Sequence, residues 1–126
     1  MSRQIITTPD APSSPLFSQG VRAGSTVYVS GMVGVDPQSG SRPESIEGQT
    51  LQALRNGEAV LRAAGCALDD VALVTVLLAH PPDFAGMNEA YAQVFPQDPP
   101  ARAVARLGPE LPGILVSIMM TAHVPD

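Results

Sequence analysis

The 126-residue sequence contains no lysine, one cysteine and two histidines. Without lysine there is no Schiff base, no lysine-anchored pyridoxal phosphate and no phosphate-loop lysine. The single cysteine, Cys66, excludes a cysteine-rich zinc site and an intrachain disulfide, and it fits a reducing, cytoplasmic compartment. His80 and His123 have no partner at metal-ligand spacing. We therefore expect no metal and no cofactor, which leaves carboxylates, hydroxyls, backbone groups, water and arginine for any chemistry.

Charge is also sparse, since 15% of the residues are charged and the formal net charge is −5. No basic run is present that would attract a phosphate backbone, so nucleic acid is not expected as a partner. No stretch reaches the roughly 20 apolar residues of a membrane span, and the N-terminal sequence lacks the pattern of a signal peptide. A thinly charged surface indicates that another subunit covers part of it, the alternative being a neutral monomer surface.

The length fits a single domain over residues 1–126, large enough for one hydrophobic core. No internal repeat or low-complexity segment is present. Proline, serine and glycine gather instead in short stretches that separate segments of regular periodicity. These stretches are "TPDAPSSP", "DPQSGSRPES", "HPPD" and "PQDPPA".

The expected order of elements is β-β-β-α-β-α-β-β, with both helices as crossovers. Residues 20–31 read as two short strands joined by a turn at residues 23–25, and residues 36–40 form a further turn. The first helix runs through 46–64, capped by Ser45 and stopped by Gly65. Asp83 caps the second helix, which ends near Phe95. The other strands are expected at 71–80, 101–107 and 114–122, and the inner helix positions are Thr50, Leu54, Gly57, Leu61, Ala64, Phe84, Met87, Tyr91 and Val94.

The segment "VALVTVLLAH" (71–80) is the strongest strand prediction, and it is apolar on both faces. A helix layer covers only one face of a sheet, so the second face needs another sheet, another helix layer or another subunit. The economical solution is an α+β layer whose free sheet face packs in an oligomer.

Five stretches together resemble successive blocks of the Rid/YjgF family, the reactive-intermediate (enamine/imine) deaminases also called endoribonuclease L-PSP. The resemblance covers residues 15 to 122 in family order and spacing. It implies a chorismate-mutase-like α+β fold, with two helices on one face of a β-sheet. It also implies a homotrimer that packs through the other sheet face, with ligand sites in clefts between subunits. The stretches are "LFSQGVRAGSTVYVSG", "DPQSG", "AAGCALDDVALVTVLL", "DFAGMNEAYAQVF" and "PPARAVARL".

Arg102 lies in the "PAR" motif, and the resemblance implies that it grips the carboxylate of a 2-imino or 2-oxo acid. A guanidinium suits this role because its planar donors match a carboxylate in two parallel hydrogen bonds. The alternative is a structural ion pair between Arg102 and an acidic residue. Arg106, further along the same strand face, is interpreted as a surface or interface salt-bridge residue.

Several family positions carry a different residue here. Ser117 stands where the family has a glutamate that orients water; a serine hydroxyl can hold water but is no general base near neutral pH. Phe17 replaces a tyrosine, while Met32 and Val104 replace a glutamine and a cysteine. Each change makes the expected pocket more apolar.

Ser30, Gly31 and Asn88 match the family pattern and are taken as substrate-binding residues together with Phe17 and Val104. Backbone amides near Gly31 and Val104 are the expected donors to the reacting centre. Other interpretations stay open for three of the side chains. They are a strand-end hydrogen bond for Ser30, a solvated surface position for Asn88 and, for Ser117, a buried hydroxyl bonded to backbone.

The function expected from the resemblance is hydrolytic deamination of 2-imino or enamine carboxylic acids to a 2-oxo acid and ammonia. Arg102 would hold the substrate, and Ser117 with backbone groups would hold the water. One alternative is a module that binds 2-oxo acids or similar small metabolites without turnover. Another is a diverged deaminase or hydrolase of a larger, more apolar substrate walled by Phe17, Met32 and Met119.

Overall fold

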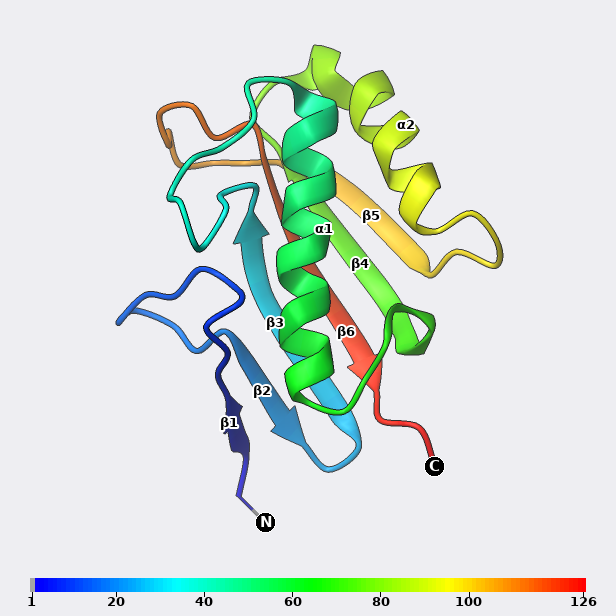
Figure 1. The fold of residues 1–126 in the computed structure, drawn as a ribbon. Helices are drawn as coiled ribbons and strands as arrows, with labels where there is room; N and C mark the ends of the chain where they lie inside the picture. Colours follow the sequence, from blue (N-terminus) through cyan, green and yellow to red (C-terminus); the bar gives the residue numbers. More distant parts are fainter. Residues whose placement is uncertain (1) are drawn as a thin grey trace.

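The computed structural model describes residues 2–126, an α+β arrangement in which two helices cover one face of a β-sheet (Figure 1). The described part of the chain contains six strands in a single sheet. In chain order the elements are β1 (Gln4–Ile6), β2 (Gly20–Ala23), β3 (Thr26–Val33), α1 (Ile46–Ala63), β4 (Val71–Leu78), α2 (Phe84–Val94), β5 (Ala101–Arg106) and β6 (Val116–His123).

The strands lie side by side in the order β1-β2-β3-β6-β4-β5. Neighbours are antiparallel except for β4 and β5, which are parallel and are joined by α2 as a crossover. The expected order of elements is therefore confirmed, and its first strand is Gln4–Ile6. Because β6 lies between β3 and β4, the C-terminal strand occupies the middle of the sheet.

Helix α1 forms as its sequence predicts. The Ser45 side chain accepts a hydrogen bond from the Gly48 amide at 3.0 Å, which satisfies one of the free donors of the first turn. Gly65 follows the helix with φ of 83°, a left-handed conformation that glycine adopts without strain. The five inner positions predicted for this helix, the last of which is the C-cap residue Ala64, are all buried.

Helix α2 differs from its prediction at the start. Pro81–Asp83 form a short 3₁₀ turn, so Asp83 has a helical backbone (φ −79°, ψ −1°) and its side chain caps nothing. An N-cap acceptor normally needs extended backbone. Phe84, predicted to face the core, is 47% exposed, whereas Met87 and Tyr91 are buried as expected.

Strand β4 ends at Leu78, two residues earlier than predicted, and its two faces differ. Val74 and Val76 are fully buried on the face that the helices cover. On the other face Leu73 is 43% exposed, and the register with β6 shifts between Val71 and Leu73. The sheet therefore has one packed face, the helix face, and one face without a helix layer, called here the open face (Figure 1).

Candidate functional site

Arg102 lies on the helix face of the edge strand β5 and is held by three residues of α2. Its Nη1 donates a hydrogen bond to Asn88 Oδ1 at 2.8 Å and lies 3.9 Å from the Met87 sulfur. Its guanidinium carbon lies 4.8 Å from the centre of the Tyr91 ring. These residues stand at positions i, i+1 and i+4 of the helix, so all three can reach one side chain. The arginine is thus fixed by an amide, a thioether and an aromatic face.

No acidic side chain neutralises this guanidinium. Within residues 2–126 the one ion pair joins Arg62 and Glu58 at 3.1 Å, so the structural ion pair considered for Arg102 does not form in this chain. A guanidinium carries five N–H donors, and the hydrogen bonds to Asn88 and to the Met87 sulfur use two of them. Arg102 is exposed, and its remaining donors are available to a ligand.

Tyr91 forms the platform beneath Arg102. It is 6% exposed, and its hydroxyl is buried without a hydrogen-bond partner within residues 2–126. Burial raises the pKa of Tyr91 above its ordinary value of 10.0, and the nearby Arg102 guanidinium opposes part of that rise. The ring therefore stays neutral near pH 7 and contributes its π face to the cation.

A groove of about 460 Å³ lies between β5 and the start of α2, and Arg102 is not among its lining residues. Its walls are mainly apolar, and the exposed Phe84 ring is one of them. Arg106 contributes a second cation to its lining. The residues that line the groove are Leu78, Pro81, Phe84, Val104, Ala105 and Arg106.

Ser117 and Gly31 lie together on the open face. Ser117 pairs with Val33 across the β3–β6 ladder and is 8% exposed. A Cβ atom at Gly31 would come within 2.7 Å of the Ser117 hydroxyl oxygen, so a side chain at position 31 would displace that hydroxyl. The β3–β6 register shifts between Val29 and Met32, which places Ser30 and Gly31 in the irregular segment of the strand.

Within one chain, Arg102 and Ser117 lie on opposite faces of the sheet. Strand β4 fixes both registers, because Val74 pairs with Arg102 and Leu77 pairs with Ser117. Val74 is fully buried beneath the helices, while Leu77, an odd number of residues further on, belongs to the open face. One copy of the chain therefore does not bring the two predicted catalytic residues together.

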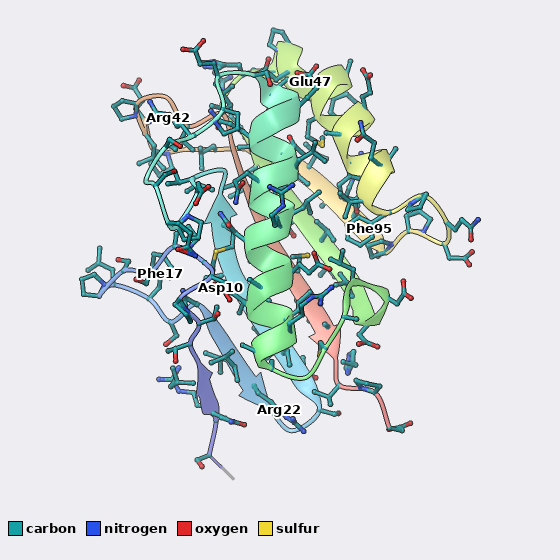
Figure 2. All side chains as sticks on the ribbon, in the orientation of Figure 1. Asp10, Phe17, Arg22, Arg42, Glu47 and Phe95 are labelled. Atoms are coloured by element: carbon teal, nitrogen blue, oxygen red, sulfur yellow. The ribbon has the colours of Figure 1, made fainter. Side chains whose placement is uncertain are left out.

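The remaining predicted residues do not gather in one place within the chain. The Ser30 hydroxyl donates to the Ser18 carbonyl at 2.5 Å, a bond to backbone. Phe17 is 45% exposed in the loop before β2 and lines a separate cavity of about 380 Å³. Figure 2 shows Phe17 and Phe95, which follows α2, on opposite sides of the molecule. Asn88 contacts Arg102, and Val104 lies on the same face of β5 as Arg102.

Comparison with known proteins identifies the family. The sequence model described as "Endoribonuclease L-PSP" matches residues 8–124. The chain belongs to this family, also called Rid/YjgF. A RutC family protein of Pyrococcus horikoshii is 37% identical over 124 residues, which cover 96% of this chain and 98% of that protein. The mouse protein named 2-iminobutanoate/2-iminopropanoate deaminase is 43% identical over 103 residues, covering 80% of this chain and 76% of its own length.

Solved structures of family members share the fold over nearly the whole chain. Yeast Mmf1 superposes with a TM-score of 0.92 at 26% identity, covering 98% of this chain and 100% of its own. E. coli TdcF, solved with bound serine, superposes with a TM-score of 0.89 at 32% identity, covering 95% of this chain and 98% of its own. The Rid/YjgF resemblance drawn from the sequence motifs is confirmed.

The sequence alone did not predict which residues hold the Arg102 side chain. Met87 and Tyr91 were assigned to the core, and both do lie there, but each also touches the guanidinium. Their positions on either side of Asn88 in the helix were the available signal.

Within residues 2–126, no three His, Cys, Asp or Glu side chains gather at metal-ligand distance. No helix in the same range is long and apolar enough to cross a membrane.

Proposed function

We propose that this Rid/YjgF protein hydrolyses 2-imino and enamine carboxylic acids to 2-oxo acids and ammonia. The mouse relative carries the name of such a deaminase at 43% identity, and the human one does so at 42%. The arrangement around Arg102 is chemically suited to this substrate class, because every member carries a carboxylate next to the reacting carbon.

The observation that carries the proposal is an oriented guanidinium without an acidic partner. Asn88 and Tyr91 hold Arg102 at an exposed edge, so its remaining donors can form two parallel hydrogen bonds with a substrate carboxylate. Such charge-assisted hydrogen bonds are about twice as strong as neutral ones and fix the orientation of a planar group. The 2-imino carbon would then lie at a set distance from the strand edge.

We further propose that a second copy of the chain completes the site, in a homotrimer that packs through the open face. This face carries Tyr28, Leu73 and Met119, which are 51%, 43% and 45% exposed. Burying such apolar side chains against another subunit is favourable. Contact between the open face of one copy and the β5–α2 edge of its neighbour would bring Ser117 and Gly31 to Arg102.

The proposed reaction is an addition followed by an elimination. Water attacks the carbon of the protonated C=N group, and the resulting amino alcohol loses ammonia to give the C=O group. An enamine first tautomerises to the imine. Ser117 would hold the attacking water by hydrogen bonding, while free backbone amides near Gly31 and on the edge strand at Val104 would donate hydrogen bonds to the oxygen of the tetrahedral centre as it loses its proton. No side chain of this set takes the water's proton, which passes through solvent to the nitrogen that leaves as ammonia, so turnover is expected to be modest.

A second candidate function is binding of a 2-oxo acid without turnover. The observation that favours it is the hydroxyl at position 117, because serine does not act as a general base near neutral pH. A larger, more apolar substrate is also compatible with the exposed Met119 on the open face.

RNA cleavage, which the family's name describes, is not proposed, since the chain has a net charge of −5 and no basic run. A cytoplasmic location is proposed from the single, buried cysteine.

The experiment that tests the proposal generates 2-iminobutanoate in situ with an amino-acid oxidase and follows its loss with and without the protein. Faster loss, abolished in Arg102→Ala but kept in Arg62→Ala, is the expected result. Binding of 2-oxobutanoate by calorimetry without any acceleration would favour the binding module instead.

A further inference from the structure

Two cations, Arg102 and Arg106, project from the same face of β5. Residues 102, 104 and 106 alternate with residues that face the other way, and they pair with Val74, Val76 and Leu78 on the helix face of β4. The two arginines are four positions apart along the strand, which corresponds to about 13 Å between Cα atoms. Val104 lies between them and is half-buried.

Helix α2 lies beside both arginines on the helix face of the sheet. Because α2 returns the chain from the end of β4 to the start of β5, it runs against the direction of β5. Its first residue, Phe84, therefore lies near the Arg106 end and lines the groove there, while Asn88, one turn later, binds Arg102. Arg106 therefore lines the apolar groove, and Arg102 lies one helical turn further along α2, beside Asn88.

Among the described residues, 2–126, no carboxylate neutralises either cation. The sequence holds 12 acidic residues against 7 arginines, yet within residues 2–126 no carboxylate forms an ion pair with Arg102 or Arg106. Glu110 lines the neighbouring cavity together with Arg106 but makes no ion pair with it. In a chain with excess acid, two exposed arginines on one strand face remain available to an anionic ligand.

We propose that Arg106 is a second anion-binding residue, and that the groove selects substrates with an acidic group at both ends. The class is the 2-imino dicarboxylic acids. The α-carboxylate binds Arg102, the methylene groups lie against Val104 and Phe84, and the distal carboxylate binds Arg106. This inference rests on the deaminase function proposed above, because it names the substrate class of that same site.

The test compares two imines of equal length, generated in situ by amino-acid oxidases. One is 2-iminoglutarate, made from glutamate, and the other is 2-iminopentanoate, made from norvaline. The quantity measured is the ratio of their kcat/KM values. We expect Arg106→Gln to lower this ratio by about tenfold or more, the effect of losing a charge-assisted hydrogen bond. Arg106→Lys should retain part of the preference, and Arg55→Gln, on the exposed surface of α1, should leave the ratio unchanged.

A ratio unaffected by Arg106→Gln, with both imines still hydrolysed, would overturn the inference and leave the deaminase function standing. If neither imine is consumed faster than in buffer, the deaminase function fails, and calorimetry with 2-oxoglutarate and 2-oxopentanoate then decides the inference. Selective weakening of 2-oxoglutarate binding in Arg106→Gln supports it. Equal weakening of both ligands, or of neither, overturns it.

Discussion

Arg102 and Ser117 lie on opposite faces of one sheet, and their registers with β4 fix this relation. Val74 pairs with Arg102 beneath the helices, and Leu77 pairs with Ser117 on the open face. Both residues match positions that the family motifs assign to one site. A site containing both therefore requires two copies of the chain, and the predictions below follow from this requirement and from the way Arg102 is held.

Replacing Arg102 by alanine should lower kcat/KM for 2-iminobutanoate by about 100-fold, since two charge-assisted hydrogen bonds are lost. Arg62→Ala is the matched control, because Arg62 pairs with Glu58 on an exposed helix surface. Steady-state kinetics on both variants provides the measurement. A loss of less than about threefold in Arg102→Ala would show that the carboxylate is held elsewhere.

Asn88 should act as a positioning residue for Arg102. Asn88→Ala removes the 2.8 Å hydrogen bond and should raise KM by about tenfold with a smaller change in kcat. Asn88→Asp should raise KM further, because a carboxylate at this position pairs with the guanidinium and competes with the substrate. Equal KM values in the aspartate and alanine variants would contradict this role.

Introducing a base at position 117 should increase turnover. Ser117→Glu places a carboxylate beside Gly31, where it can take a proton from the attacking water, and general-base catalysis contributes about 100-fold or more. The rate of the variant should also rise with pH as the new carboxyl ionises. A rate equal to or below that of the wild-type protein, in a variant with unchanged circular dichroism, would count against the assigned role of Ser117.

The buried hydroxyl of Tyr91 should destabilise the fold. Tyr91→Phe removes a polar group that has no partner while keeping the ring beneath Arg102, so the free energy of unfolding should rise by about 1 kcal/mol. Chemical denaturation near neutral pH measures this. A decrease of similar size would mean that the hydroxyl has a stabilising partner.

The same variant should change the alkaline stability profile. The pKa of Tyr91 is raised in the folded state, so above about pH 10 the unfolded chain loses a proton that the folded chain keeps. This contribution to stability is complete below that pH and is lost as the pH rises further. Phenylalanine does not ionise, so the stability of Tyr91→Phe should fall less steeply over this pH range than that of the wild-type protein. Denaturation at several pH values measures the difference.

The local features of the fold were predictable because they depend on neighbouring residues. Ser45, the inner positions of α1 and Gly65 follow from helix periodicity and capping, and the structure confirms them. Asp83 precedes α2 as predicted, but its side chain makes no capping hydrogen bond, since the preceding prolines form a 3₁₀ turn with it. Phe84 then falls outside the core and lines the groove.

The arrangement of the candidate site was less predictable. The motif identified Arg102, but alternation along a strand says only which residues share a face, not which face the helices cover. Which face the helices cover depends on how distant segments pair, above all on the position of β6 between β3 and β4. The contacts of Arg102 with Asn88 and Tyr91 likewise depend on how α2 packs on the sheet edge.

Complementation between inactive chains tests the shared site most directly. Arg102→Ala and Ser117→Leu chains, each inactive alone, are co-expressed with different tags, and the doubly tagged assemblies are isolated and assayed for imine loss. Mixtures of each with the Arg102→Ala/Ser117→Leu double variant serve as controls. A trimer that holds both single variants has one intact site of three, so the mixed assemblies should show about a third of the wild-type activity and the controls none. No recovery in mixed assemblies of the two single variants would contradict a site built from two copies of this chain.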